Sequence, residues 1–465
     1  MADLSAIFKA YDIRGVVPDQ LDEDLARRIG AAFAAVQDLA AAGREHGAGA
    51  ARVVVGRDMR ASSGPLAAAF AEGLTRSGVD VVDIGLASTD QLYFASGALD
   101  APGAMFTASH NPAQYNGIKL CRAGAAPVGK ETGLVDIQRL VEAGEAAEPA
   151  GDRDPGSVEQ RDMLSEYAAH LHKLVPVSGR RLKVVVDAGN GMGGHTVPAV
   201  FADLDVELVP MYFELDGTFP NHEANPIEPA NLLDLQRRVV DSAADLGLAF
   251  DGDADRCFVV DERGEVVTPS ALTALIAVRE LEREPGSSVI HNLITSRAVP
   301  EIVTRHGGTP VRSRVGHSYI KATMAETGAI FGGEHSGHFY FRDFWRADSG
   351  MLAALHALAA LAATDAGTTL SSLLADYAPY SPSGEINSTV RDQQAALARV
   401  EQAYAGRDGV TVDHLDGLTV EHPDWWFNVR ASNTEPLLRL NAESADEQTT
   451  AAVRDEVLNL IRSSS

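Results

Sequence analysis

The 465-residue chain has only two cysteines, Cys121 and Cys257. Two cysteines cannot build a disulfide framework, so the composition fits a reducing compartment. The first residues, Met1–Ser5, show no basic segment followed by an apolar one, so no signal peptide is expected. Long apolar runs are also lacking, because the longest, Met351–Ala363, is interrupted by His356 and is too short to cross a bilayer. We therefore expect a cytoplasmic protein without a membrane partner.

Basic residues are few relative to acidic ones. The chain has 39 Lys and Arg against 65 Asp and Glu, a formal net charge of −26. A nucleic-acid partner needs a basic face, so none is expected. A small anionic ligand is not excluded, because charges more than about 8 Å apart are largely screened and a local basic pocket can still bind phosphate. With 45% hydrophobic and 22% charged residues, the composition disfavours disordered and fibrous classes.

Short β-branched runs alternate with helical patterns through the first three quarters of the chain. The run Arg52–Gly56 is typical of a buried strand, and Leu182–Asp187 and Val206–Met211 are also predicted strands. Three successive units each show a strand, a polar or glycine-rich turn and a helix, which predicts an α/β fold with mixed, largely parallel sheets. The last segment has five short predicted strands and two flanking helices, which indicates a C-terminal α+β domain with a mostly antiparallel sheet.

These patterns predict four domains. A linker without periodicity is expected over residues 142–156. The predicted α/β domains cover residues 1–150, 151–261 and 262–378, and the α+β domain covers residues 379–465.

The segment Asp251–Arg256 alternates three aspartates with Gly and Ala between two predicted strands. Residues two apart in an extended chain point to the same side, so the three carboxylates are expected to converge. Left unpaired they would raise one another's pKa, whereas Mg²⁺ prefers oxygen ligands. We interpret Asp251, Asp253 and Asp255 as magnesium ligands, with Arg256 as a cation suited to phosphate. A solvated acidic turn is the alternative, and an EF-hand loop is disfavoured because a strand precedes Glu262.

Ser109 lies where the predicted strand over residues 104–107 ends and a loop begins, a common position for chemistry in α/β sheets. A serine hydroxyl is a weak nucleophile unless a base or a metal assists it. His110 is a candidate base, although neighbours in the sequence rarely face each other. The alternative interpretation is an ordinary turn at Asn111–Pro112.

Two further polar loops are candidates for binding. In the first, Glu334, Ser336 and His338 alternate and are expected to present one hydrogen-bonding edge to sugar hydroxyls; a metal site built on the two histidines of this loop competes with that interpretation. The second, Arg430–Pro436, supplies several donors and a backbone turn suited to an anion. Taken alone, the first loop is also explained as a polar hairpin and the second as a surface turn.

Five segments in this order resemble the phosphohexomutase family, in particular its phosphomannomutase/phosphoglucomutase members. They are Tyr11–Gly15, Thr107–Pro112, Asp251–Arg256, Gly333–His338 and Arg430–Pro436. The resemblance extends from Phe8 to Arg439, and the ordered set is far more specific than any one segment. His335 occupies a position that varies within the family, so it does not separate hexose from amino-sugar substrates.

The resemblance implies four domains around a central cleft and a magnesium-dependent enzyme that carries a phosphoryl group on Ser109. The implied metal ligands are Ser109, Asp251, Asp253 and Asp255. The implied catalytic residues are Ser109, His110, Lys119 and Arg256, with either Lys119 or His110 as the general acid and base. The implied substrate-binding residues are Tyr11, Arg14, His317, Glu334, Ser336, His338, Arg430, Ser432, Asn433 and Thr434.

The expected function is a reversible ping-pong mutase that interconverts hexose 6-phosphate and hexose 1-phosphate, with hexose 1,6-bisphosphate as intermediate and activator. The expected partner is a small phosphosugar, and the protein is expected to be a monomer or a homodimer. Three alternatives are a phosphoglucosamine mutase, a magnesium-dependent sugar phosphatase and, more remotely, a non-catalytic sugar-phosphate-binding protein.

Overall fold

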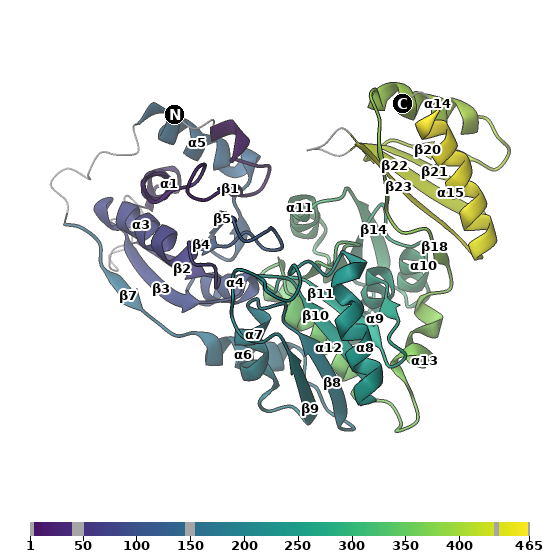
Figure 1. The fold of residues 1–465 in the computed structure, drawn as a ribbon, viewed down its shortest axis with the longest axis horizontal. Helices are drawn as coiled ribbons and strands as arrows, with labels where there is room; N and C mark the ends of the chain where they lie inside the picture. The colour runs from purple at the N-terminus through teal and green to yellow at the C-terminus, as the bar shows by residue number, and fades with distance from the viewer. Residues whose placement is uncertain (1–3, 40–50, 145–153, 432–436, 464–465) are drawn as a thin grey trace. The chain divides into compact units, whose positions relative to one another are not determined.

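The structure is a computed structural model that describes residues 4–39, 51–144, 154–431 and 437–463 (Figure 1). Contacts divide the chain into two compact units. Unit 1 consists of Met1–Val267 and Ser336–Ser372, and unit 2 consists of Thr268–His335 and Leu373–Ser465.

The first sheet of unit 1 carries the Ser109 loop. Its strands follow the order β1-β5-β4-β2-β3-β7, and β6 pairs with β5. The strands β2, β3, β4 and β7 are joined in parallel, whereas β5 pairs antiparallel with β1, β4 and β6. The bounds are β1 Ile13–Val16, β2 Arg52–Arg57, β3 Asp80–Leu86, β4 Gly103–Phe106, β5 Tyr115–Arg122, β6 Ala126–Pro127 and β7 Val158–Gln160.

Helices cover both faces of this sheet because its central strands are apolar on both sides. Val53 and Val55 of β2 belong to a core shared with the helices α1 Glu23–Val36, α3 Ser63–Arg76 and α5 Leu134–Ala143. Val54, between them, is also buried and points to the opposite face, where α4 Thr89–Ala98 packs on β2 and β4. Two-sided burial is what the continuous Val run predicts.

The second sheet of unit 1 carries the aspartate loop. Its strand order is β12-β11-β10-β8-β9, parallel from β9 to β10 and antiparallel from β10 to β12. The strands are β8 Leu182–Asp187, β9 Val206–Met211, β10 Leu246–Phe250, β11 Cys257–Asp261 and β12 Val266–Val267. The accompanying helices are α6 Leu164–Leu174, α7 Gly193–Phe201 and α8 Leu233–Ser242.

The remainder of unit 1 is a short hairpin followed by a buried helix. The hairpin pairs β16 Phe339–Phe341 antiparallel with β17 Ala347–Asp348. The helix α12 Gly350–Ala362 is buried along its whole length, as expected of a helix that is apolar all round. Among the described residues no helix is long and apolar enough to cross a membrane.

Unit 2 begins with a parallel arrangement in which β13 lies between β14 and β15. These strands are β13 Ser288–Asn292, β14 Thr309–Ser313 and β15 Phe331–Gly333, and their helices are α9 Pro269–Arg283, α10 Ala298–Arg305 and α11 His317–Thr327. The short helix α13 Leu370–Leu374 spans the change from unit 1 to unit 2.

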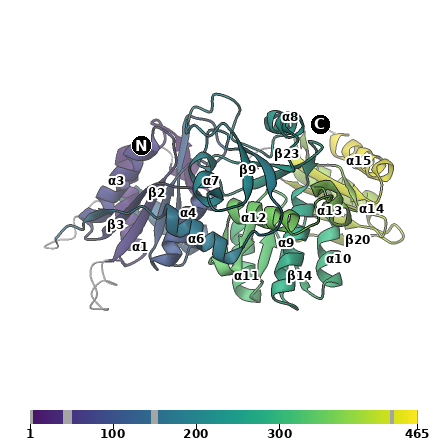
Figure 2. The ribbon, with the colours of Figure 1, turned by 90° about the horizontal axis from the view of Figure 1, so that it is seen from below.

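The C-terminal part of unit 2 is an antiparallel sheet in the order β18-β23-β22-β21-β20, with β19 also paired to β23. Its strands are β18 Ser381–Pro382, β19 Ile386–Thr389, β20 Thr411–Asp413, β21 Leu418–Glu421, β22 Trp425–Ala431 and β23 Leu437–Ser444. The helices α14 Gln393–Tyr404 and α15 Glu447–Arg462 share one apolar core with this sheet (Figures 1 and 2). The predicted α+β character of this segment is confirmed.

The mixed α/β sheets of the remaining chain are also confirmed. The linker predicted over residues 142–156 overlaps the end of α5, and residues 145–153 lie outside the described part of the chain. The four domain boundaries and the central cleft stay predictions.

Candidate active site

Ser109 lies in the loop that follows β4, and its backbone has a φ of +50°. This left-handed conformation is uncommon for a residue with a Cβ. The backbone N–H of Ser109 donates to Thr107 Oγ1 at 2.9 Å, and the Oγ donates to Asp251 Oδ2 at 2.6 Å. The His110 Nδ1 atom is 3.2 Å from the same Oγ. The side chains of Ser109 and His110 therefore do approach each other, because the left-handed backbone at Ser109 turns the chain between them.

The aspartate loop connects β10 to β11, and all three carboxylates are buried. One ligand atom from each of Asp251, Asp253 and Asp255 lies within 4.8 Å of the other two, so their predicted convergence is confirmed. The route differs from the one expected. The segment is a turn with Ala254 in the left-handed region at φ +58°, not an extended chain, because the antiparallel hairpin must reverse direction there.

Gly252 lets the aspartate loop approach the Ser109 loop closely. A Cβ atom added at Gly252 would lie 2.3 Å from the carbonyl oxygen of Ser109, well inside contact distance. The glycine between Asp251 and Asp253 is thus required by the approach of a second loop, whose residues lie more than 140 positions earlier in the chain.

Arg256 links the serine and the first aspartate. Its Nε and Nη2 donate to Asp251 Oδ2 at 2.9 and 2.8 Å, and Nη2 lies 3.2 Å from Ser109 Oγ and also contacts His110 Nδ1. Burial raises the pKa of Asp251 to about 7, although the Arg256 charge opposes the rise. Burial and the adjacent Arg256 charge hold the pKa of His110 well below its usual range.

Lys119 projects from β5 to the other two aspartates. Its Nζ donates to Asp253 Oδ2 at 2.7 Å and to Asp255 Oδ2 at 2.6 Å. Although burial opposes both charges, the ion pair holds the pKa of Lys119 well above and that of Asp253 below its usual value. Thr89 at the start of α4 also donates to Asp253 Oδ2, at 2.6 Å.

The residues fit a divalent cation. Asp253 Oδ1 and Asp255 Oδ1 are buried and have no hydrogen-bond partner among the described residues. Buried polar atoms are nearly always satisfied, so two orphaned carboxylate oxygens in one cluster indicate a missing partner. A hard cation that prefers oxygen ligands supplies what these atoms lack.

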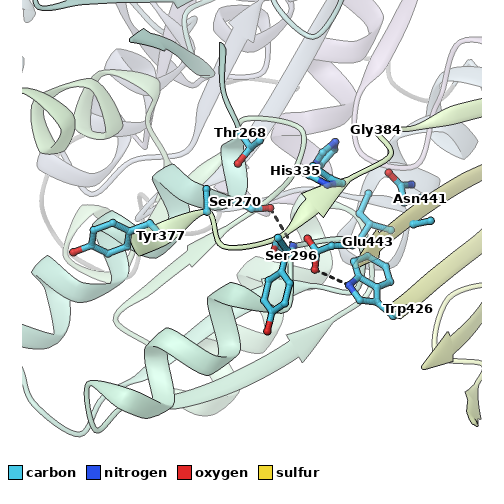
Figure 3. A pocket seen from close by; sticks show the side chains of 14 residues that line it. Thr268, Ser270, Ser296, His335, Tyr377, Gly384, Trp426, Asn441 and Glu443 are labelled. Atoms are coloured by element: carbon cyan, nitrogen blue, oxygen red, sulfur yellow. Dashed lines mark hydrogen bonds between the residues drawn. The ribbon is translucent and has the colours of Figure 1, made fainter. Parts of the chain in front are cut away.

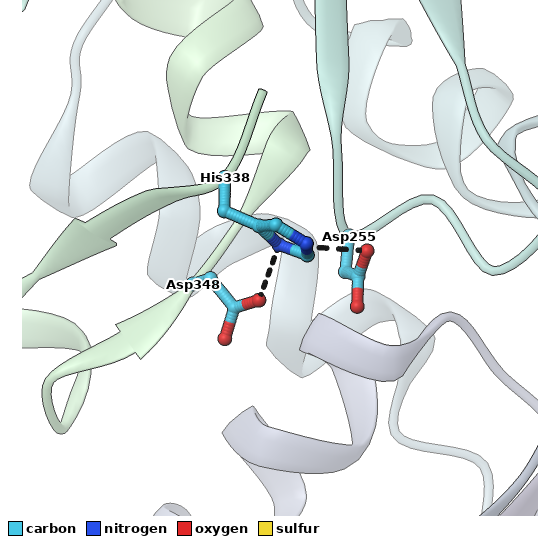
Figure 4. A group of neighbouring side chains, drawn as sticks. All are labelled: Asp255, His338 and Asp348. Carbon is cyan, nitrogen blue, oxygen red and sulfur yellow. Dashed lines mark hydrogen bonds and ion pairs between the residues drawn. The ribbon is translucent and has the colours of Figure 1, made fainter. Parts of the chain in front are cut away.

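His338 lies directly before β16 and faces Asp255 and Asp348 (Figure 4). Its Nδ1 atom is 2.9 Å from Asp348 Oδ2 and 3.8 Å from Asp255 Oδ1. Although burial lowers it, the carboxylates of Asp255 and Asp348 raise the pKa of His338 above its usual value. These three residues form a second acidic and histidine cluster that shares Asp255 with the first. The sequence placed His338 among the substrate ligands and did not indicate Asp348.

The remaining predicted residues of unit 1 are Tyr11, Arg14 and Ser336. Arg14 donates through Nε to Asp12 Oδ2 at 3.1 Å and through Nη1 to the side chain of Asn111. Tyr11 is half-buried in the loop before β1, and Ser336 is half-buried at the start of the second segment of unit 1. Their predicted roles in substrate binding stay predictions.

Unit 2 holds the remaining predicted residues. Glu334 is buried and accepts a hydrogen bond from the backbone N–H of Gly316 at 3.0 Å. Arg430 is paired with Glu385 at 3.0 Å. His317 is the first residue of α11, and nothing is described of its side chain; Ser432, Asn433 and Thr434 lie outside the described residues.

A small cavity in unit 2 has His335, next to Glu334, in its lining (Figure 3). It is lined by His335, Ser270, Asn441 and Trp426 among others, and its volume is about 50 Å³. Ligand pockets typically measure about 300–1,000 Å³, so this cavity is too small for a hexose phosphate. Burial lowers the pKa of His335.

Comparison with known proteins gives matches to four domain families along the chain. Four families described as phosphoglucomutase/phosphomannomutase domains match it in order: alpha/beta/alpha domain I over residues 5–148, domain II over 165–264, domain III over 268–380 and the C-terminal domain over 385–460.

Full-length relatives agree with the domain matches. A phosphomannomutase of Salmonella montevideo is 42% identical, covering 98% of this chain and 99% of the relative. Phosphohexose mutases of Xanthomonas campestris pv. campestris are 42% identical over 98% of this chain and 99% of theirs. A crystal structure of a phosphoglucomutase/phosphomannomutase family protein from Burkholderia thailandensis is 35% identical, with a TM-score of 0.87 over 100% of this chain and 98% of that one.

The fold and the matches along the chain are those of a phosphohexose mutase, an enzyme that interconverts positional isomers of a hexose phosphate. The chain belongs to the phosphoglucomutase/phosphomannomutase family. The family, the fold class and the enzyme class predicted from the sequence are confirmed.

Proposed function

We propose that the protein interconverts hexose 6-phosphate and hexose 1-phosphate through a phosphoserine at position 109 and a hexose 1,6-bisphosphate. The observation that carries the proposal is the position of Ser109. The residue is only 4% exposed, and its Oγ lies 2.6 Å from Asp251 Oδ2 in a buried aspartate cluster. Relatives named phosphomannomutase and phosphohexose mutase support the substrate class.

In the forward half-reaction a sugar hydroxyl attacks the phosphorus of phosphoserine 109. The new bond joins the sugar oxygen to phosphorus, the bond between phosphorus and Ser109 Oγ breaks, and the hydroxyl proton passes to a base. The second half-reaction returns the other phosphoryl group to Ser109, after the bisphosphate has reversed its orientation. Such chemistry depends mainly on positioning and on neutralising charge.

Each residue of the cluster has a defined task in this scheme. Asp251, Asp253 and Asp255 would hold Mg²⁺, with Ser109 or its phosphate as a further ligand; the bound cation supplies positive charge at the transferring phosphoryl group. Arg256 stands 3.2 Å from the serine oxygen and stabilises charge that develops there. His110 Nδ1 is equally near this oxygen, and Lys119 reaches the aspartates from β5, so both stay candidates for the acid and base.

The proposal assigns substrate recognition to residues outside this cluster. Glu334 and Ser336 bind sugar hydroxyls, Arg430, Ser432, Asn433 and Thr434 bind the phosphate that does not react, and Tyr11, Arg14, His317 and His338 contribute further contacts. The family resemblance and the family matches support these assignments.

The assay that tests the function follows both products at once. With glucose 1-phosphate, magnesium and a trace of glucose 1,6-bisphosphate, we expect glucose 6-phosphate to form without release of inorganic phosphate. Ser109→Ala should lose at least about 1,000-fold in kcat, as expected when a covalent carrier is removed. EDTA should abolish turnover and added Mg²⁺ should restore it. Inorganic phosphate as the main product would instead indicate a phosphatase, and unchanged turnover by Ser109→Ala would refute the proposal.

A further inference from the structure

Arg60, in the loop between β2 and α3, is a buried arginine that the proposed chemistry does not use. Arg60 is 3% exposed and its neighbour Asp58 is fully buried. A buried charged pair needs hydrogen bonds for each of its polar atoms, because desolvating two charges is costly. The groups that accept hydrogen bonds from Arg60 therefore indicate which part of the structure it supports.

The guanidinium of Arg60 donates to four backbone carbonyls of the segment that contains Ser109. Its Nη2 donates to the carbonyl oxygens of Ser109 and Asn111 at 2.9 and 2.6 Å. Its Nη1 donates to those of Pro112 and Tyr115 at 2.8 and 3.0 Å. A guanidinium has five donors in a fixed planar arrangement, and four of them are spent on this one loop.

The fifth donor and the surroundings fix Arg60 itself. Its Nε donates to Asp58 Oδ2 at 3.2 Å, and Asp58 Oδ1 accepts from the Arg60 backbone at 3.0 Å and from Ser63 Oγ at 2.5 Å. The Arg60 Cζ atom lies 5.0 Å from the centre of the Phe219 ring. The side chain is thus held in one orientation before any substrate arrives.

The loop needs such support because its backbone is unfavourable on its own. Ser109 holds a φ of +50°, a left-handed conformation that is unfavourable for a residue with a Cβ. Its carbonyl oxygen accepts a hydrogen bond from Arg60 and also packs closely against Gly252 of the aspartate loop. This one peptide therefore sets the distance between the serine oxygen and the aspartates.

We propose that Arg60, oriented by Asp58, is a positioning residue that holds the Ser109 loop so that Oγ faces Asp251. The proposal rests on the proposed role of Ser109 as phosphoryl carrier. Arg60 does not touch the reacting atoms and acts through the backbone of residues 109–115.

The test replaces Arg60 by lysine and measures chemistry separately from substrate binding. Lysine keeps the charge but presents a single ammonium, which cannot bond both pairs of carbonyls. We expect Arg60→Lys to lower kcat about 100-fold, the effect of an error of about 1 Å in a reacting group, with the KM for glucose 1-phosphate within about threefold. Phosphorylation of Ser109 by glucose 1,6-bisphosphate, followed by intact mass, should slow by a similar factor.

Arg180→Lys is the matched control for loss of a structural arginine. Arg180 pairs with Asp245 at 2.8 Å and donates to the carbonyl of Thr368 at 3.0 Å, so it is a part-buried arginine that joins distant segments of unit 1 and is not bonded to the Ser109 loop. This variant should lower Tm but keep kcat near that of wild type. An equal loss of kcat in Arg180→Lys at matched Tm would overturn the proposal.

Asp58→Asn keeps the test decisive if Arg60→Lys fails to fold. It retains the shape of the side chain but removes the charge that orients Arg60, and we expect a fall in kcat of about tenfold without a matching change in KM. Unchanged kcat in Arg60→Lys, or in Asp58→Asn where the first variant does not fold, overturns the positioning role. Full activity of Ser109→Ala would show instead that the underlying carrier role is wrong.

Discussion

At the scale of single residues, the site depends on backbone conformations that its local sequence does not announce. Ser109 and Ala254 both carry a side chain in the left-handed region, and each turns a neighbouring polar group toward the same point. Such strain persists only where surrounding contacts enforce it. Here the contacts come from distant segments, through Arg60 on one side and Gly252 on the other.

Gly252→Ala tests the packing of the two loops. The added Cβ would meet the Ser109 carbonyl at 2.3 Å, so the loops must separate and the serine oxygen must move from Asp251. We expect kcat to fall by about 100-fold, because a displacement of about 1 Å has that cost. Gly64→Ala in α3 is the control, since nothing lies within 4 Å of its added Cβ and alanine favours a helix by about 0.5–1 kcal/mol. Equal kcat in wild type and Gly252→Ala would contradict this account of the site.

At the scale of secondary-structure elements, the buried carboxylate of Asp90 joins three helices through hydrogen bonds. Asp90 in the first turn of α4 accepts from Tyr167 of α6 at 2.8 Å and from Ser349 at the start of α12 at 2.6 Å. The adjacent Thr89 donates its backbone N–H to the Asp253 carbonyl at 2.9 Å. The start of α4 therefore ties the elements that surround Asp253 to one another.

Asp90 gives stability a pH dependence of known sign. Burial raises its pKa to about 6, although three hydroxyl donors oppose the rise. The folded state therefore binds more protons than the unfolded state between about pH 4 and pH 6, and the contribution of Asp90 to stability falls as pH rises through this window, by about 3 kcal/mol. Asp90→Asn cannot titrate, so the Tm of wild type relative to this variant should decrease from pH 4 to pH 7. A Tm difference that is constant with pH would contradict the buried, shared carboxylate.

The sequence predicts strands well where a short run of Val and Leu marks them. β8, which is mostly buried, and β9, which is not, both begin and end at the predicted residues. β5 was not predicted, since Asn116, Gly117 and Lys119 interrupt its apolar pattern. Asn116 donates to the hydroxyls of Ser62 and Ser63, and Lys119 donates to the aspartates, so polar contacts and not an apolar pattern hold this part of the strand.

The site divides in the same way. The serine and the aspartates stand in compact motifs and were predicted. Arg60 and Thr89 bond to residues at least 49 and 164 positions away in the chain, and Asp348 bonds to His338, 10 positions away, and these three were not predicted. The sequence analysis did not identify Arg60, although the charged segment Asp58–Arg60 directly after a buried strand is a local signal that could have indicated it. Contacts over such separations depend on topology, which one sequence does not specify residue by residue.

At the scale of the whole molecule, an acidic protein must bind an acidic substrate. The net charge of −26 repels hexose phosphates at long range, so the proposed function requires local cations, and Arg256, Arg14 and Arg430 are the candidates that the proposal names. The matches to relatives run over nearly the entire chain, so all four domain families contribute to the same enzyme.

Sugar preference is a property of this complete enzyme. If Glu334 and Ser336 bind the 3- and 4-hydroxyls, the configuration at carbon 2 is not recognised, and the kcat/KM values for glucose 1-phosphate and mannose 1-phosphate should agree within about tenfold, or 1.4 kcal/mol. Steady-state kinetics with each sugar under the same magnesium and bisphosphate concentrations measure this. A preference of 1,000-fold or more, on the order of 4 kcal/mol, would show that carbon 2 is recognised.

The central claim is that Ser109 carries the phosphoryl group, and intact-mass analysis tests it most directly. The purified protein is measured before and after incubation with glucose 1,6-bisphosphate, and then after an excess of glucose 6-phosphate, with peptide mapping of any modified species. The account predicts one phosphoryl group on Ser109 that the bisphosphate adds and the monophosphate removes, and none on Ser109→Ala. A phosphoryl group mapped to another residue, or turnover without any phosphorylated protein, would contradict it.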